Sequence, residues 1–192
     1  MVQSDEILIA EILKGNHAGY EHLVRKYQNK VYPVIYRMVH SQEDALDLTQ
    51  ETFLQAYRQL SQFKNQAKFY TWLYRIATNK TLDFLRKEKS RTEKTDKLVN
   101  ESKGSFSLNS EQSNPEQLYI QRERQELVQE VIKSLPEKYL ITLILNHYQQ
   151  LSYHEIADIL QIPLKTVATR IYRARLLLKE KILKGGDEFE LL

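Results

Sequence analysis

The residues best suited to reading DNA lie late in the sequence, where residues 152–175 read SYHEIADILQIPLKTVATRIYRAR. Ser152 and Glu155 form a capping box, so a helix is expected to begin there. Pro163 ends it, because the residue before a proline is pushed out of the α region. Gln161 occupies a turn position that often needs a positive φ and is commonly glycine. A residue other than glycine in this conformation costs about 1 kcal/mol. A short helix, a tight turn and a basic second helix are typical of a helix-turn-helix.

The second helix of this pair carries side chains that match the groups on base edges. Lys165 and Arg170 can reach guanine, and Thr166 or Thr169 can reach a base edge or a phosphate. The opposite face is an apolar stripe at helical spacing, formed by Val167, Ile171, Ala174 and Leu178. An ordinary helical hairpin would have the same stripe, but the small Ala157 and the tight turn favour DNA binding.

A second candidate nucleic-acid surface mixes aromatic and basic residues in the stretch 60–89. Aromatic rings stack on unpaired bases and cations follow phosphates, which is typical of proteins that bind single strands. The aromatic residues are Phe63, Phe69, Tyr70, Trp72 and Tyr74. The interleaved basic residues are Lys64, Lys68, Arg75, Lys80, Arg86 and Lys87. Core packing is the alternative interpretation, and we prefer it for Leu73, Ile76 and Leu82, with Trp72 half in the core.

Four acidic residues and no basic residue lie between Glu43 and Glu51. This cluster predicts a basic partner. A metal site on Asp44, Asp47 and Glu51, which are three and four residues apart, is the alternative. The sequence offers no obvious histidine or fourth carboxylate to complete such a site, so we expect no metal and no cofactor.

Catalytic motifs are missing from the sequence. The histidines are scattered, with no HExxH pattern and no convergent carboxylates, so we expect no enzyme; a helical nuclease is the rival that this argues against. The chain has no cysteine, which excludes disulfides, cysteine-ligated zinc and thiol redox sensing by this chain.

The elements that position these residues are predicted to be helices. The chain has 192 residues with only five glycines and four prolines, which favours an all-α fold over turn-rich β and Rossmann folds. Apolar residues recur at helical spacing near residues 5–14, 20–39, 43–60 and 68–89, and again near 127–135, 139–148, 151–160 and 164–183. Pro33 is expected to kink or split the second helix.

Two small helical domains joined by a flexible polar linker are therefore expected. Residues 1–90 form the first domain and residues 116–184 the second, helix-turn-helix domain. Residues 91–115 have few apolar side chains and no period, so they are predicted to be the linker. Residues 185–192 form an acidic tail.

Charge is unevenly distributed, although the net charge is only +3. Two basic blocks, at residues 64–91 and 161–184, are about a hundred positions apart and suggest two contacts with a polyanion. The N-terminus has no basic stretch before an apolar run, so no signal peptide is expected. No apolar run approaches the roughly 20 residues of a membrane span, and a cytoplasmic location is expected.

Four strings carry a family resemblance: DALDLTQETFLQAY at residues 44–57, FYTWLYRIATNKTLDFLRKEK at 69–89, SLPEKY at 134–139 and LSYHEIADILQIPLKTVATRIYRAR at 151–175. In this order they resemble the group IV, or extracytoplasmic-function (ECF), sigma factors of bacterial RNA polymerase. The resemblance covers nearly the whole chain outside 91–115 and the last eight residues. It implies a sigma2-like domain, a linker without a sigma3 domain, and a sigma4-like helix-turn-helix domain.

The resemblance also implies roles for individual residues. Contact with the clamp helices of the largest polymerase subunit would involve Asp44, Asp47, Leu48, Gln50 and Glu51, supported by Phe53 and Leu54. A base of the minus-ten element would be captured by the loop before the aromatic helix, through Phe63, Lys64, Asn65, Gln66, Ala67 and Lys68. The melted strand or the edge of the duplex would be held by Phe69, Tyr70, Trp72, Tyr74, Arg75, Asn79, Lys80, Asp83 and Arg86. The minus-thirty-five element would be read by Lys165, Thr166, Ala168, Thr169, Arg170 and Arg173.

The partners implied by the resemblance are core RNA polymerase, through its clamp helices and flap, promoter DNA, and an anti-sigma factor that is often membrane-anchored. The free protein is expected to be a monomer. A stand-alone helix-turn-helix regulator is the alternative function, but it assigns no function to the acidic stretch or to residues 69–89. Such a regulator would bind duplex DNA tightly without polymerase. A purely structural interaction protein fits the helices but not the two basic blocks.

Overall fold

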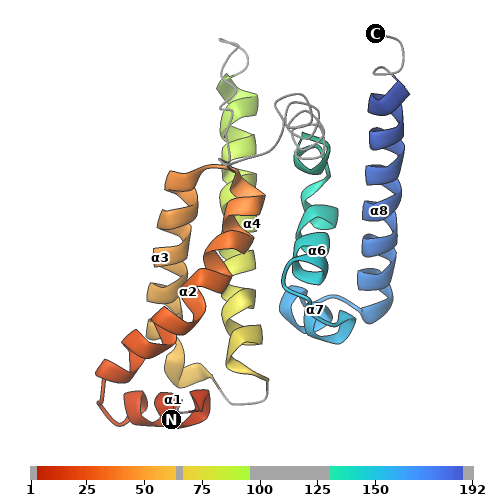
Figure 1. Cartoon of the computed structure of the whole chain (residues 1–192). Coiled ribbons are helices and arrows are strands. Elements are labelled where there is room, and N and C mark those ends of the chain that lie inside the picture. The colour runs from red at the N-terminus through yellow and green to blue at the C-terminus, as the bar shows by residue number, and fades with distance from the viewer. Residues whose placement is uncertain (1–3, 64–66, 96–129, 188–192) are drawn as a thin grey trace, which may run out of the picture.

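The computed structural model describes residues 4–63, 67–95 and 130–187, and within these residues the regular elements are all helices (Figure 1). The prediction of an all-α fold with two helical domains is confirmed. The helices of the first domain are α1 (Asp5–Leu13), α2 (Ala18–Val39), α3 (Gln42–Arg58), the short 3₁₀ helix η1 (Leu60–Gln62) and α4 (Phe69–Thr95). The second domain contains α6 (Glu137–His147), α7 (Tyr153–Leu160) and α8 (Leu164–Asp187).

The core of the first domain is formed where α2 packs against both α3 and α4, and α3 packs against α4. Leu23 and Ile35 of α2 and Leu73 of α4 are fully buried in it. Thr52 and Thr81 are also fully buried, and each hydroxyl donates a hydrogen bond to the carbonyl four residues earlier in its own helix. The polar groups are thereby satisfied, which removes most of the cost of burying them.

The expected split of the second helix at Pro33 does not occur, since α2 continues to Val39. Pro33 removes one backbone N–H, but buried residues lie on both sides of it, including Val31 and Val34. Their packing against α3 and α4 holds the helix together, because tertiary burial outweighs a single lost hydrogen bond.

The second domain is centred on α6, in which every residue from Leu140 to Leu145 is buried. A helix that is apolar all round must be covered on all sides. Here α8 and α7 of its own domain and α2 of the first domain provide the cover. The helix expected near 127–135 is described only from residue 130, and residues 130–133 are helical.

The helix-turn-helix forms as predicted. The Ser152 hydroxyl accepts from the Glu155 N–H, and the Glu155 carboxylate accepts from the Ser152 N–H at 2.9 Å, which completes the capping box. Gln161 has φ +53°, as expected from its turn position. Its side-chain amide donates to the carbonyl of Asp158 at 2.8 Å, which ties the left-handed residue to the end of α7.

Two helices extend past the boundaries that were predicted for their domains. Helix α4 continues to Thr95, past the expected linker start at 91, and α8 continues to Asp187, past the expected tail start at 185. The rest of the predicted linker, 96–115, and residues 188–192 of the tail lie outside the described residues.

The two domains are in contact with each other. Helix α4 of the first domain packs against α7 of the second, and α2 packs against α6. In Figure 1 the second domain therefore stands alongside α2 and α4, rather than apart from them. The sequence predicted two domains on a flexible connection and did not predict this contact.

Candidate polymerase and nucleic-acid interface

The acidic residues predicted to bind polymerase lie on the outer face of α3. Asp47, Gln50 and Glu51 are exposed there. Leu54 is 50% exposed and continues this face by one turn. Leu46, which is 46% exposed beside Asp47, was not predicted. An apolar residue outside the buried stripe of its helix is the signal that could have identified it.

Other members of the predicted α3 set occupy different environments. Leu48 and Phe53 are buried in the core of the first domain, so they position the helix and do not present a surface to a partner. Asp44 is partly exposed in the first turn, where its N–H donates to the Ser41 hydroxyl at the helix cap. The face available to a partner is therefore acidic with an apolar margin.

An ion pair joins this acidic face to α4. Lys80 Nζ lies 2.9 Å from Glu51 Oε2. Lys80 was predicted to contact DNA and Glu51 to contact polymerase, so the pair connects the two predicted surfaces. An exposed pair of this kind contributes about 1 kcal/mol or less, so either partner can exchange it for an intermolecular contact.

The aromatic residues near the start of α4 form a cluster. The ring of Phe63 lies 5.7 Å from that of Phe69 and 5.3 Å from that of Trp72, and Phe69 and Trp72 are 5.7 Å apart. Phe69 is buried, whereas Phe63 and Trp72 are half-buried. Phe69 therefore supports the cluster from within, and the other two are accessible at its margin.

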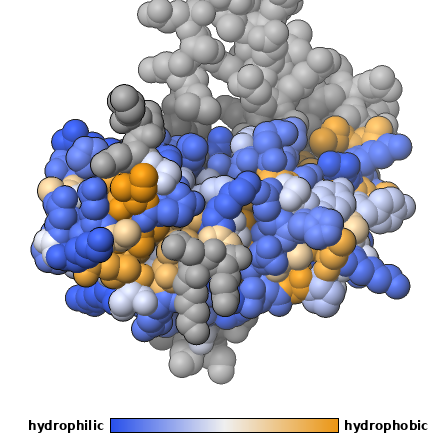
Figure 2. All heavy atoms as spheres, turned by 90° about the horizontal axis from the view of Figure 1, so that it is seen from below, coloured by the Kyte–Doolittle hydropathy of each residue, from blue (hydrophilic) through white to orange (hydrophobic). Residues whose placement is uncertain are grey.

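The predicted capture loop is only partly described. Ala67 and Lys68 are exposed, while Lys64, Asn65 and Gln66 lie outside the described residues. The end of the first domain that carries this loop is seen in Figure 2, where hydrophilic side chains cover most of the surface and hydrophobic groups are scattered among them.

The outer face of α4 is polar, as predicted. Asn79 is exposed, and Arg75 and Lys80 are partly exposed. Asp83 and Arg86 form an exposed ion pair at 2.9 Å. Asp83 therefore orients the Arg86 side chain along the helix surface and is not itself a contact for a DNA phosphate.

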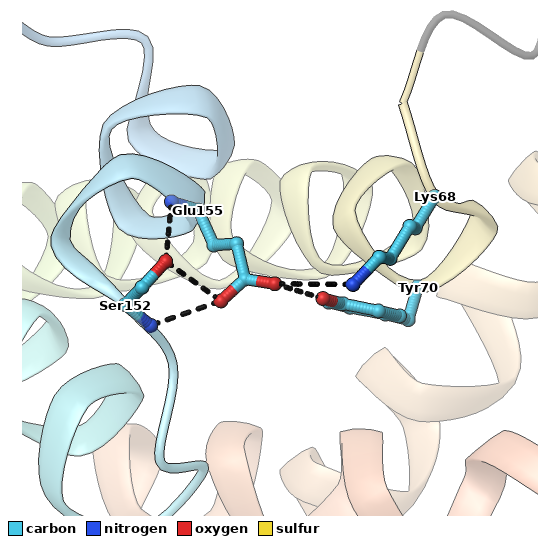
Figure 3. Close-up of polar contacts among 4 residues, drawn as sticks. All are labelled: Lys68, Tyr70, Ser152 and Glu155. Carbon is cyan, nitrogen blue, oxygen red and sulfur yellow. Dashed lines mark hydrogen bonds and ion pairs between the residues drawn. The ribbon is translucent and has the colours of Figure 1, made fainter.

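Two tyrosines on α4 are directed toward the second domain. Tyr74 is buried, and its hydroxyl donates to Gln149 Oε1 at 2.6 Å. The Tyr70 hydroxyl donates to Glu155 Oε1, and Lys68 Nζ lies 3.7 Å from the same oxygen (Figure 3). These hydrogen bonds to the second domain were not predicted from the sequence.

The same contacts shift the acidity of the groups involved. The hydrogen bond from Tyr70, followed by that from the Ser152 N–H, lowers the pKa of Glu155 to about 2. Burial and the hydrogen bond to Glu155 raise the pKa of Tyr70. At neutral pH Glu155 is therefore a carboxylate and Tyr70 a neutral donor, which is the pairing that a charge-assisted hydrogen bond needs.

The residues predicted to read the minus-thirty-five element share one surface of α8. Lys165, Ala168, Thr169 and Arg173 are exposed. The Thr169 hydroxyl donates to the carbonyl of Lys165 at 2.8 Å, so it meets a base or phosphate only as an acceptor unless it rotates. Thr166 and Arg170 are partly exposed.

Two further features of this surface were not predicted. Tyr172, on the same helix, is 68% exposed. Arg173 Nη1 lies 3.5 Å from the Tyr139 hydroxyl of α6, and this hydrogen bond lowers the pKa of the Tyr139 phenol. Tyr139 thus helps to orient a guanidinium that faces the expected DNA.

The described residues contain no group of three or more His, Cys, Asp or Glu side chains that could hold a metal ion. Among the helices that the structure describes, none is both long and apolar enough to cross a bilayer.

Comparison with known proteins matches both halves of the chain. The family model for sigma-70 region 2 matches residues 23–91, and that for sigma-70 region 4 matches residues 125–178. The chain is 38% identical to the ECF RNA polymerase sigma-E factor of Escherichia coli K12 over 181 residues, which cover 93% of this chain and 94% of the relative. It is 36% identical to the RNA polymerase sigma-H factor of Pseudomonas aeruginosa over 176 residues, covering 90% and 91%.

Two solved structures share the fold. The structure of CnrH in complex with the cytosolic domain of CnrY matches with a TM-score of 0.66 at 24% identity, covering 93% of this chain and 96% of that one. The Bartonella quintana sigma factor RpoE, solved with the anti-sigma factor NepR, matches with a TM-score of 0.67 at 19% identity, covering 86% and 96%. Because both family regions occur in order and the curated relatives match along nearly their whole length, the chain belongs to the ECF sigma factors, the subunits that direct bacterial RNA polymerase to specific promoters.

Proposed function

We propose that this ECF sigma factor divides its work among three helix faces. The outer face of α3 binds the clamp helices of core RNA polymerase, the first half of α4 with the preceding loop captures the melted minus-ten element, and the first half of α8 reads the minus-thirty-five element. The observation that carries this assignment is the segregation of charge. The acidic residues face solvent on α3, whereas the basic residues face solvent on α4 and α8.

The core-binding assignment rests on both charge and shape. Asp47, Gln50 and Glu51 attract a basic partner, and the exposed Leu46 and Leu54 supply apolar area beside them. An apolar centre with a charged rim is the usual anatomy of a protein interface. Leu48 and Phe53 contribute indirectly, because they are buried in the core and fix the orientation of α3.

The minus-ten assignment uses the accessible part of the aromatic cluster. Phe63 and Trp72 are available to stack on an unpaired base, and each such stack contributes about 1–3 kcal/mol. Lys68, Arg75 and Lys80 lie near enough to follow the backbone of the strand. Unstacking a base costs a few kcal/mol, so one or two stacks with phosphate contacts are sufficient to trap it.

The partners follow from the same assignment. Core RNA polymerase and promoter DNA are needed for activity, and the protein acts in the cytoplasm as a specificity subunit rather than as an enzyme. Two structural neighbours were solved with inhibitors, namely CnrH with the cytosolic domain of CnrY and RpoE with the anti-sigma factor NepR. We infer that an anti-sigma factor, membrane-anchored or soluble, also holds this protein, which is a monomer when free of it.

Run-off transcription tests the proposal. Core polymerase, this protein and a pooled library of upstream DNA fragments are expected to yield transcripts with defined start sites. Two shared upstream motifs, near positions minus ten and minus thirty-five, are expected among the active fragments. The absence of transcripts, together with specific duplex binding by the protein alone, would instead identify a stand-alone helix-turn-helix regulator.

A further inference from the structure

A cavity of about 500 Å³ lies between the end of α2, the second half of α4 and the start of α6. This volume is within the range of sites that bind small molecules. One side of the cavity is apolar and is formed by Met38, Leu85, Leu135 and Leu140. None of the residues that line the cavity belongs to the three helix faces assigned to polymerase and promoter DNA.

The other side of the cavity carries a concentration of positive charge. Lys89 comes from α4, Lys133 from the helical turn 130–133, and Lys138 from the first turn of α6. Glu137 supplies the only carboxylate among the described lining residues. In the part of the chain that the structure describes, none of the three lysines forms an ion pair. Three ammonium groups around one cavity therefore favour an anion inside it.

His40 adds a polar atom that lacks a partner. Its Nε2 is buried and has no hydrogen-bond partner among the described residues, although such atoms are normally paired in folded proteins. The residue is held by its backbone, because it is the left-handed C-cap of α2 and its N–H donates to the carbonyl of Tyr36 at 2.8 Å. Since His40 also lines the cavity, a ligand there can supply the missing acceptor.

We propose that this cavity binds a small phosphate-bearing molecule, and that a nucleotide is the class that fits both of its sides. The phosphate oxygens accept from the lysine ammonium groups and from the His40 Nε2–H, while the base lies against the apolar side. The N-terminus of α6 opens on the same cavity at Glu137 and Lys138, so its dipole adds to the attraction.

The charge of the cavity selects the kind of anion. Three lysines against one carboxylate leave an excess that a single negative charge does not neutralise, so a di- or triphosphate is preferred to a simple carboxylate. Glu137 repels any anion, and for this reason more than one phosphate contact is needed. The inference does not depend on the proposed function, because binding needs neither polymerase nor DNA.

Calorimetric titration of the full-length protein tests the site. Pyrophosphate and ATP are used as separate probes, in a phosphate-free buffer without added metal ions. Each is expected to bind one molecule per chain with a dissociation constant of about 1 mM or lower. Tighter binding of ATP would show that the apolar side receives the base, and equal affinities would identify a site for the phosphates alone. If both probes bind more weakly than about 1 mM, the proposal is overturned.

A pair of double variants separates the cavity from general attraction to a basic protein. Lys133→Gln with Lys138→Gln removes two of the cavity cations and is expected to weaken pyrophosphate binding about tenfold. Lys14→Gln with Lys179→Gln is the matched control, since it removes the same charge from two exposed positions outside the cavity. An equal loss of affinity in both double variants would overturn the site.

The imidazole of His40 gives a readout inside the cavity. Burial, followed by repulsion from Lys133, lowers the pKa of His40 to about 4. A bound anion favours the protonated ring, so saturating pyrophosphate is expected to raise the pKa of His40 to its ordinary value near 6.5 or above it. Nuclear magnetic resonance measures this pKa, and His40→Asn identifies the signal by its loss. An unchanged His40 pKa in the presence of bound pyrophosphate would place the anion elsewhere and overturn the proposal.

Discussion

Asp47 and Leu48 are neighbours in the sequence, but they lie on different faces of α3. Asp47 faces solvent and Leu48 faces the core. Family resemblance assigned both to one contact surface, whereas the helical period of 3.6 residues separates them by about 100°. At the scale of single residues, exposure thus decides which members of a predicted set can touch a partner.

Reversing the charge of Asp47 is expected to weaken core binding. Asp47→Lys places a cation in an acidic face that meets a basic partner, so we expect a loss of tenfold or more in affinity for core polymerase. The melting temperature should change little, since the side chain is exposed. Asp158→Lys, an exposed acidic position on α7, is the control. Unaltered binding in a polymerase pull-down by Asp47→Lys would remove α3 from the proposed interface.

Arg170 on α8 is expected to contribute to base selection. A bidentate arginine contact to guanine provides about 1–3 kcal/mol of discrimination, so Arg170→Ala should lower promoter occupancy by the holoenzyme and relax preference at one position of the minus-thirty-five element. Lys179→Ala, farther along α8, should leave the preference intact. Sequencing of bound fragments from a randomised promoter pool measures both. An identical motif for Arg170→Ala and wild type would contradict the assignment.

At the scale of elements, the ends of helices depend on local chemistry that the sequence partly reveals. The capping box of α7 and the left-handed Gln161 were both predicted. The left-handed C-cap of α2 at His40, with φ +58°, was not predicted, because glycine and asparagine are the residues usual at this position. Its position also places the imidazole in a partly buried site beside Lys133 of the second domain.

His40 is expected to make stability depend on pH. Burial, followed by repulsion from Lys133, lowers the pKa of His40 from 6.5 to about 4. The unfolded chain therefore binds a proton between pH 6.5 and 4 that the folded protein does not, so acid favours unfolding in that window. From pH 7 to pH 5 this linkage lowers the free energy of unfolding by about 2 kcal/mol without solvent screening. Because His40 is only partly buried, screening by solvent reduces the effect, and we expect a fall of about 1 kcal/mol for wild type relative to His40→Asn.

Asparagine suits this comparison because it tolerates the left-handed region and does not titrate. Urea unfolding at pH 5, 6 and 7 measures the difference between the two proteins. Parallel curves for His40→Asn and wild type would show that the imidazole titrates in the folded protein as it does in the unfolded chain.

At the scale of the whole molecule, the contact between the domains couples their stabilities. Arg37 and Tyr148 contribute a cation–π contact, worth about 0.5–2 kcal/mol, and neither residue belongs to the proposed DNA surfaces. Tyr148→Ala should therefore weaken the coupling without altering either core.

Differential scanning calorimetry can measure this coupling. Wild type is expected to unfold in one transition, and Tyr148→Ala should separate it into two, one for each domain. Tyr172→Ala, which removes an exposed tyrosine on α8, is the control and should keep the single transition. One unchanged transition for Tyr148→Ala would show that this contact does not couple the domains.

Much of this protein could be predicted from its sequence, because the relevant information is local. Helical periodicity predicted the all-α fold, Ser152 and Glu155 predicted the start of α7, and the order of the motifs predicted the family. The acidic and basic faces were predicted as well, since charges spaced three and four residues apart share a side of a helix. These features depend on residues within a few turns of one another.

Only the tertiary structure decided which predicted residues are buried and how the domains meet. Leu48, Phe53, Phe69 and Tyr74 lie in the interior because of helices that pack from elsewhere in the chain. In the sequence, Glu155 is recognisable as part of a helix cap. Its second carboxylate oxygen accepts a hydrogen bond from Tyr70, 85 residues earlier in the chain, only because α7 packs on α4. Packing between distant segments depends on the shapes of whole surfaces, which no local pattern encodes.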